Sequence, residues 1–145
     1  MVQSILTVCV GNICRSPMAE GMLRERLPTM TVSSAGIGAL AGKPADPHAV
    51  SLLGERGIDI RAHRARQISV QACKQADLIL VMEEAHKRVI ARTFGGTVGK
   101  LFLLGHHEKF DVFDPHRQGR ERFEDCFALI SRGVEDWVTR IKACG

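Results

Sequence analysis

The sequence predicts an α/β fold, in which a four-stranded parallel sheet is flanked by helices on both faces. Two observations lead to this prediction. Four short apolar runs alternate with amphipathic segments along the 145 residues, and capping residues, prolines or glycines mark many of the boundaries. Strands separated by helices run parallel, because each helix returns the chain to the same end of the sheet. The length suits one domain over 1–145.

The first three elements are a strand, a helix and a second strand. SILTVCV at 4–10 is apolar, rich in β-branched residues and followed by a glycine, as expected of a buried strand. A helix over 17–27 comes next, with Ser16 as its N-cap and a proline at its first position. TMTVSSAG at 29–36 is the second strand.

Two helices and a third strand occupy the middle of the chain. Asp46 and Pro47 repeat the cap-and-proline start before HAVSLLGERG, which a glycine ends. Ser69 begins a short helix that runs through Gln75, and ADLILVM at 76–82 is the third strand.

A helix, a strand and a last helix complete the order β-α-β-α-α-β-α-β-α. EEAHKRVIARTF at 83–94 is a helix that ends before a glycine pair, and KLFLL at 100–104 is the fourth strand. A long polar loop, GHHEKFDVFDPHRQGRE, follows. The last helix starts at about Arg122, and its apolar residues recur at a spacing that is typical of core packing. These residues are Phe123, Phe127, Ile130, Val134, Trp137 and Ile141.

The composition argues against several functional classes. Hydrophobic residues make up 45% of the chain, but no apolar run approaches the ~18 residues of a membrane helix, so we expect no membrane insertion. The N-terminus lacks the features of a signal peptide, and the five cysteines show no zinc-ribbon spacing. Both observations predict a cytoplasmic protein with reduced thiols. The basic residues are scattered and tyrosine is absent, which disfavours a module that binds nucleic acid.

The segment CVGNICRS lies where the first strand meets the following helix. Such a loop can bind an anion, because its backbone N–H groups are unpaired and the helix dipole adds roughly half a positive charge. Gly11 and Asn12 tolerate the positive φ that a tight loop requires, and Arg15 offers a planar fork to two phosphate oxygens. We expect Cys9 to be a nucleophilic thiolate beneath the anion, with Ser16 donating a hydrogen bond to its sulfur.

Both cysteines of this loop have a second interpretation. A free cysteine is usually a small buried hydrophobe, but the Cys-x5-Arg-Ser pattern between a strand and a helix favours the nucleophile for Cys9. Cys14 is either a packed residue or a redox guard, which would trap an oxidised Cys9 as a disulfide.

A thiolate that attacks an aryl phosphate needs an acid to protonate the leaving phenolate. The long polar loop offers Glu108, Asp111 and Asp114. The residues alone do not choose among them, although Pro115 stiffens the backbone behind Asp114 and weakly favours it.

CVGNICRS resembles the phosphate-binding loop of the low-molecular-weight protein tyrosine phosphatases, and the resemblance extends in order over nearly the whole chain. The matching residues beyond the loop are Ser34, Asp46-Pro47, His63 and Asp114-Pro115. The opening ILTVCVGNICRSPMAEG and the DPHR run look closest to bacterial members that act on tyrosine autokinases of exopolysaccharide export. The resemblance implies a protein-tyrosine phosphatase that forms a cysteinyl-phosphate intermediate and regulates exopolysaccharide or capsule production.

The resemblance also implies roles for individual residues. Asp114 would protonate the phenolate and then activate the hydrolytic water. Ser34 and His63 would form a supporting network with Asn12 and Ser16. Consecutive residues after the nucleophile would bind the phosphate, namely Val10, Gly11, Asn12, Ile13, Cys14, Arg15 and Ser16.

The residues after the acid depart from the family pattern. Where relatives place aromatic residues, this chain has His116 and Arg117. We therefore expect the substrate ring to contact His116, with Ile13 and Leu40 on the rim. The expected partner is a phosphotyrosine protein bound by a monomer. No metal or organic cofactor is implied, since the adjacent His106-His107 pair has no further ligands nearby in the sequence.

The main alternative is a thiol-dependent arsenate reductase of the same fold, because arsenate mimics phosphate. That chemistry needs two more cysteines on a mobile segment after the third strand, and MEEAHKRVIARTF contains none. GIGALAG at 36–42 matches no nucleotide-binding motif, and we expect it to be a loose rim loop.

Overall fold

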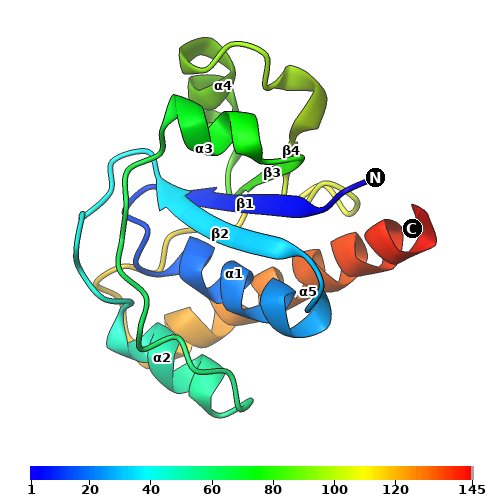
Figure 1. Cartoon of the computed structure of the whole chain (residues 1–145). Coiled ribbons are helices and arrows are strands. Elements are labelled where there is room, and N and C mark those ends of the chain that lie inside the picture. The colour runs from blue at the N-terminus through cyan, green and yellow to red at the C-terminus, as the bar shows by residue number, and fades with distance from the viewer. Residues whose placement is uncertain (145) are drawn as a thin grey trace.

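Four parallel strands, in the order β2-β1-β3-β4, form the centre of the molecule (Figure 1). The computed structural model describes residues 1–144. The strands are Ser4–Cys9 (β1), Thr31–Gly36 (β2), Leu78–Val81 (β3) and Leu101–Leu103 (β4). The predicted four-stranded parallel sheet is therefore confirmed, with each strand slightly shorter than expected.

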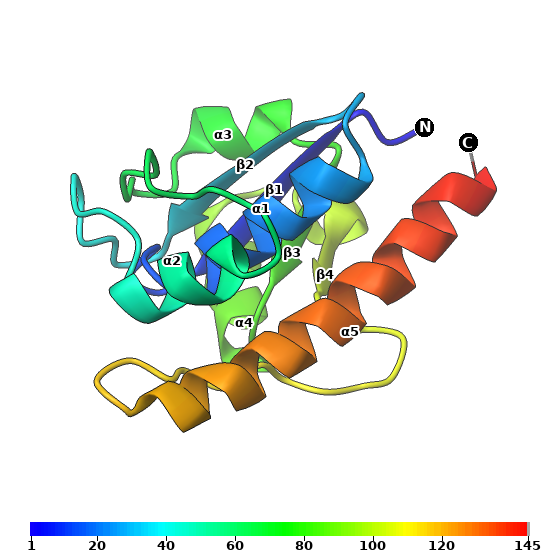
Figure 2. The same ribbon diagram turned by 90° about the horizontal axis from the view of Figure 1, so that it is seen from below.

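Helices cover both faces of the sheet, as predicted. The helices are α1 (Arg15–Arg26), α2 (Pro47–Gly54), α3 (Val70–Gln75), α4 (Glu84–Thr93) and α5 (Arg120–Cys144), with a short 3-10 helix, η1 (Val98–Lys100), before β4. Three of them, α1, α2 and α5, lie on one face, and α3 and α4 lie on the other (Figure 1). Figure 2 shows α5 running along the first of these faces. Within 1–144, no helix combines the length and apolar character needed to cross a membrane.

The side chains of β1 alternate between two cores, and this alternation orients Cys9. Ile5 and Cys9 belong to the core beneath α1 and α5, whereas Leu6 and Val8 belong to the core beneath α3 and α4. Successive residues of a strand point to opposite faces of a sheet. Cys9, at the carboxyl end of β1, therefore points to the face on which α1 begins.

Helix α1 starts earlier than predicted, and Ser16 is not its N-cap. The N-cap is Cys14, which makes no capping hydrogen bond with its side chain, and Ser16 is already inside the helix. The prediction was wrong because the hydroxyl of Ser16 has other partners, Cys9 and Asn12. A local capping rule is thus overridden by contacts within the loop.

The other helix boundaries lie close to their predicted positions. Asp46 caps α2 and Ser69 caps α3, each accepting a hydrogen bond from a backbone N–H in the first turn. Helix α5 begins at Arg120 instead of Arg122. Its predicted apolar stripe is buried in the core, apart from Phe127, which is partly buried.

Candidate active site

Cys9 is the last residue of β1 and is almost entirely buried. Its Sγ lies 2.9 Å from Oγ of Ser16 and accepts a hydrogen bond from the backbone N–H of Asn12 at 3.3 Å. Hydrogen bonds of this kind stabilise negative charge on the acceptor. Both contacts can therefore stabilise negative charge on the sulfur while it attacks or leaves.

The carbonyl groups of the loop are all engaged outside the cavity. Each carbonyl from Cys9 to Cys14 accepts a hydrogen bond of 2.7 to 3.2 Å. The donors are the backbone N–H groups of Met18, Ile37, Gly38, Leu40 and Asp46, and Nε2 of His63. Outward carbonyls leave the N–H groups of the loop facing inward, where an anion can accept from them. The segment after β2 supplies three of these donors, so it lies at the rim as predicted but is not loose.

Asn12 adopts the left-handed backbone conformation, with a φ of 61°. Gly11 has no positive φ, so the expectation was correct for Asn12 alone. The side-chain Nδ2 of Asn12 donates to Oγ of Ser16 at 2.8 Å and to Oγ of Ser34 at 3.0 Å. Its Oδ1 accepts from the backbone N–H of Arg66 at 2.9 Å. These bonds offset the backbone strain, which costs about 1–2 kcal/mol.

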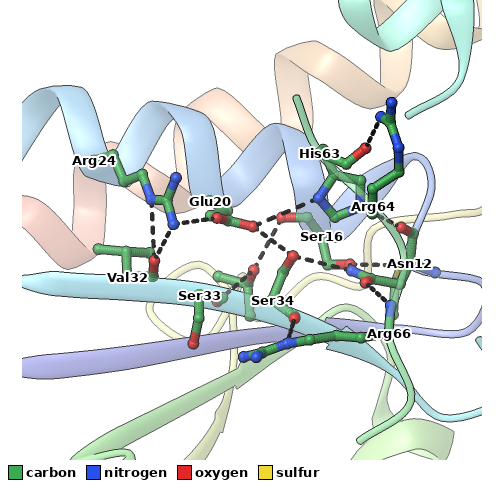
Figure 3. Close-up of polar contacts among 12 residues, drawn as sticks. Asn12, Ser16, Glu20, Arg24, Val32, Ser33, Ser34, His63, Arg64 and Arg66 are labelled. Carbon is green, nitrogen blue, oxygen red and sulfur yellow. Dashed lines mark hydrogen bonds and ion pairs between the residues drawn. The ribbon is translucent and has the colours of Figure 1, made fainter. Parts of the chain in front are cut away.

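Figure 3 shows that the network continues along α1. Oγ of Ser34 donates to Oε1 of Glu20 at 2.5 Å, and Glu20 forms an ion pair with Arg24 at 2.8 Å. The guanidinium of Arg24 donates to the carbonyl of Val32 in β2. The sequence interpretation missed Glu20 and Arg24. The available signal was their spacing, since Ser16, Glu20 and Arg24 recur every four residues and share one helix face.

His63 completes this network from the segment between α2 and α3. Its Nε2 donates to the carbonyl of Asn12 at 2.7 Å, and its Nδ1 lies 4.0 Å from Oε1 of Glu20. The structure therefore brings Ser34 and His63 together with Asn12 and Ser16, as the resemblance implied.

Arg15, the expected phosphate clamp, is 2% exposed and is held by two acceptors. Its Nη1 donates to Oε2 of Glu83 at 2.5 Å and to the carbonyl of Val112 at 2.9 Å. Fixing a guanidinium through one nitrogen orients its other N–H groups for a bidentate oxyanion. The sequence interpretation missed Glu83, although it lies just beyond the carboxyl end of β3, the edge at which ligands of parallel sheets bind.

His86 lies one turn beyond Glu83 on α4. Its Nε2 is 3.5 Å from Oε2 of Glu83. Burial, reinforced by the positive charge of Arg15, holds the pKa of His86 below its usual range. The imidazole is therefore neutral near pH 7, and Arg15 is the charged partner of Glu83.

Of the three candidate acids, Asp114 is the one that lines the cavity. Its Oδ2 lies 3.7 Å from Nη2 of Arg15, and its Oδ1 accepts from the backbone N–H of His116 at 3.0 Å. Glu108 instead pairs with α5, and Asp111 accepts from the backbone at the start of α4. The geometry thus distinguishes three residues between which the residue types alone could not choose.

The loop, the segment after β2 and the Asp114 segment enclose a cavity of about 210 Å³. Its lining is Cys9, Val10, Gly11, Ile13, Cys14, Arg15, Gly38, Leu40, Asp114 and His116. The predicted rim residues are therefore at the cavity. A larger hollow of about 760 Å³ lies at the opposite, amino ends of the strands, beside Val2 and Trp137. Since ligands of parallel sheets bind at the carboxyl ends, the smaller cavity is the candidate site.

Cys14 is buried beside this cavity, and its surroundings disfavour ionisation. Burial, reinforced by the negative charge of Asp46, raises the pKa of its thiol far above the usual range. A neutral thiol attacks oxidised sulfur slowly, and the redox-guard role of Cys14 stays a prediction. Ligand atoms of Cys14, Asp46 and His116 lie within 4.8 Å of one another, a grouping that could hold a metal ion.

Comparison with known proteins identifies the family. The model of the low molecular weight phosphotyrosine protein phosphatase family matches residues 4–144. The chain belongs to this family. It is a low-molecular-weight protein-tyrosine phosphatase, an enzyme that hydrolyses phosphoric monoesters.

Three bacterial proteins show how far the similarity extends. The probable low molecular weight protein-tyrosine-phosphatase EpsP of Ralstonia solanacearum is 52% identical over 145 residues, covering 100% of both chains. Wzb of Escherichia coli K12 is 42% identical over 144 residues, covering 99% of this chain and 98% of that one. The solved structure of Vibrio vulnificus Wzb in complex with benzylphosphonate has a TM-score of 0.93 and 39% identity, covering 97% of this chain and 99% of that chain.

Proposed function

We propose that this phosphatase hydrolyses protein phosphotyrosine through a cysteinyl-phosphate intermediate, with residues 1–145 acting as one catalytic domain. The observation that carries the proposal is the loop around Cys9. Its carbonyls are all engaged elsewhere, so its N–H groups and Arg15 can surround an oxyanion directly above the sulfur. None of the steps below requires a metal or an organic cofactor.

In the first step, Sγ of Cys9 attacks the phosphorus of the bound ester. The S–P bond forms while the bond between phosphorus and the phenolic oxygen breaks. Asp114 donates its proton to the departing phenolate, because its carboxyl group faces the same cavity. Arg15 and the loop N–H groups stabilise the charge on the phosphoryl oxygens.

In the second step, water hydrolyses the intermediate. The water oxygen attacks phosphorus while the carboxylate of Asp114 takes a proton from the water. The S–P bond breaks, and phosphate is released. Ser16, whose Oγ lies 2.9 Å from Sγ, stabilises the leaving thiolate.

We propose a bacterial tyrosine autokinase as the physiological substrate, with control of exopolysaccharide or capsule production as the consequence. The full-length likeness to EpsP and Wzb supports this substrate. The rim supports it too, because Val10 and Leu40 are 41% and 46% exposed and leave the cavity open to a phosphotyrosine on an extended tail. The expected cytoplasmic location and monomeric state stay predictions.

Hydrolysis of an aryl phosphate, with chelator present, tests the mechanism. We expect the wild type and a Cys144→Ser control, which removes an exposed thiol, to be active, and Cys9→Ser to be inactive. Added glycerol should divert part of the phosphoryl group to glycerol phosphate, since an intermediate partitions between water and alcohol. Activity retained in Cys9→Ser would overturn the proposal. Arsenate-dependent thiol oxidation would instead support the reductase.

The substrate proposal has its own test. The tyrosine-phosphorylated tail of an autokinase from the source organism should be dephosphorylated, while a matched phosphoserine peptide should not. Failure on every such tail, despite activity on aryl phosphates, would refute the autokinase and leave the mechanism standing.

A further inference from the structure

We propose that Cys14, Asp46 and His116 form an inhibitory binding site for Zn²⁺ at the mouth of the active site. The three side chains come from the loop before α1, the N-cap of α2 and the segment after Asp114. Their ligand atoms lie within 4.8 Å of one another. The inhibitory part of this inference rests on the proposed function of the cavity, whereas the binding part does not.

Asp46 and His116 each have a ligand atom that is available to a cation. Oδ1 of Asp46 accepts from the backbone N–H of His48, which leaves Oδ2 for another partner. Nδ1 of His116 is buried and has no hydrogen-bond partner. Buried polar atoms are nearly always paired, so this nitrogen is available to a ligand that the protein itself does not supply.

The three donor atoms match the preferences of Zn²⁺. Sulfur, imidazole nitrogen and carboxylate oxygen are its three usual ligand types, and three protein ligands leave a fourth position for water or substrate. Bond lengths near 2.0–2.3 Å place tetrahedral ligands roughly 3.5 Å apart. A separation of at most 4.8 Å therefore needs only a small movement of the partly exposed His116 or Asp46.

Binding would change the state of Cys14 without any redox step. The thiol loses its proton to solvent as the S–Zn bond forms. A coordinated Cys14 can no longer form a disulfide with Cys9. Coordination of His116 also fixes the segment that carries Asp114 and places a cation where the substrate ring would enter.

Charged residues of the cavity act on a bound cation in opposite directions. Arg15 repels a cation, but Asp114 and Asp46 attract it, and Cys14 feels the negative charge of both carboxylates. Phosphate could occupy the fourth position on Zn²⁺, because Arg15 and the loop hold an oxyanion nearby. We therefore expect phosphate to raise the affinity for Zn²⁺, and Zn²⁺ to raise the affinity for phosphate.

A Co²⁺ titration tests the binding part. Cys9→Ser removes the other thiol of the cavity, and in this background Co²⁺ should give a sulfur-to-metal charge-transfer band that Zn²⁺ displaces. His116→Gln and Asp46→Asn should each weaken Zn²⁺ affinity by about 10-fold or more, and Asn at 46 can still cap α2. The controls, His107→Gln and Cys73→Ser, should bind within about 2-fold of the parent. A missing sulfur band, or unchanged affinity in both site variants, would overturn the proposal.

Inhibition is measured separately, in protein with Cys9 intact. Zn²⁺ should inhibit aryl phosphate hydrolysis, and the inhibition constant should rise by about 10-fold or more in Asp46→Asn. An inhibition constant that depends on Asp114 but is unaltered by Asp46→Asn and His116→Gln would place the ion on the catalytic residues and refute the site. If the enzyme proves inactive, the proposed function fails, while the Co²⁺ titration still decides the binding site.

Discussion

The two sides of the cavity at Cys9 are built differently. On the floor, Asn12, Ser16 and Ser34 are at most 4% exposed and joined by hydrogen bonds of 2.8 and 3.0 Å. On the opposite side, the side chain of Asp114 is 48% exposed and lies 3.7 Å from Arg15. Its segment, 105–119, contains no helix or strand.

This difference matches the two tasks that the proposed mechanism assigns to the site. Binding a phosphoryl group depends on donors that are fixed before the substrate arrives, because reorganising them during the reaction would raise the barrier. Proton transfer to the leaving group needs an acid that lets the substrate enter and the product leave. Arg15 connects the two sides, since it begins α1 on the floor and contacts both Glu83 and Asp114.

Among substitutions on the two sides of the cavity, removing the proposed acid Asp114 should cause the largest change. We expect Asp114→Asn to lower kcat by about 10²–10⁴-fold for phenyl phosphate, whose leaving group is a poor one. The loss should be much smaller for an ester of an acidic phenol, which leaves without protonation. Asp111→Asn, a change in the same loop, is the matched control. A loss independent of the leaving group would show that Asp114 acts through structure alone.

Substitution of Glu83 tests whether activity depends on the fixed orientation of the Arg15 guanidinium. Glu83→Gln keeps an acceptor for Nη1 but removes the charge, and we expect kcat/KM to fall by about 10-fold, of the size that one charged hydrogen bond supplies. The affinity for vanadate, used as an analogue of phosphate, should fall with it. Glu84→Gln, at the exposed neighbouring position, should behave as wild type. Unchanged vanadate affinity in Glu83→Gln would contradict a role in orienting Arg15.

Ser34 tests the rigidity of the floor. Ser34→Ala removes the donor to Glu20 and one acceptor of Asn12, so we expect a loss of about 1–3 kcal/mol in unfolding free energy. A several-fold lower kcat should accompany it, because Asn12 loses part of the support for its left-handed backbone. Ser33→Ala, on the other face of β2, serves as the control in thermal unfolding and in the assay. A normal kcat in a destabilised Ser34→Ala protein would show that Ser34 contributes to stability but not to catalysis.

The residues alone predict the contiguous part of the site, and the family resemblance adds Ser34, His63 and Asp114. The strand–loop–helix around Cys9 could be recognised because its residues are neighbours in the chain and obey local rules of conformation. Glu20, Arg24 and Glu83 were missed, because their spacing or place in the chain does not reveal which side chain each one contacts once distant elements pack together. The same applies to the grouping of Asp46 with His116, which are 70 positions apart in the numbering.

Two predictions from local sequence rules were wrong because tertiary contacts decide the local structure there. Ser16 had the sequence of an N-cap, but its hydroxyl is used by Cys9 and Asn12. The glycine-rich segment after β2 had the composition of a loose loop, yet it donates backbone hydrogen bonds to three carbonyls of the loop around Cys9. Gly36 permits this approach, because a Cβ there would lie 2.4 Å from the carbonyl oxygen of Val10.

The smallest effect is expected for Leu40→Ala, a substitution on the rim of the cavity that leaves the floor intact. Leu40→Ala keeps the backbone N–H that donates to Gly11 but removes apolar area that a substrate ring would bury. Because Leu40 is only partly covered, the loss is about 1 kcal/mol, or roughly 5-fold in KM for an aryl phosphate. Inhibition by inorganic phosphate, which has no ring, should be unchanged, and Val98→Ala, far from the cavity, should alter neither. If phosphate inhibition weakened together with KM, the rim and the floor would be one cooperative unit, and the division of the cavity into a rigid and an open side would be wrong.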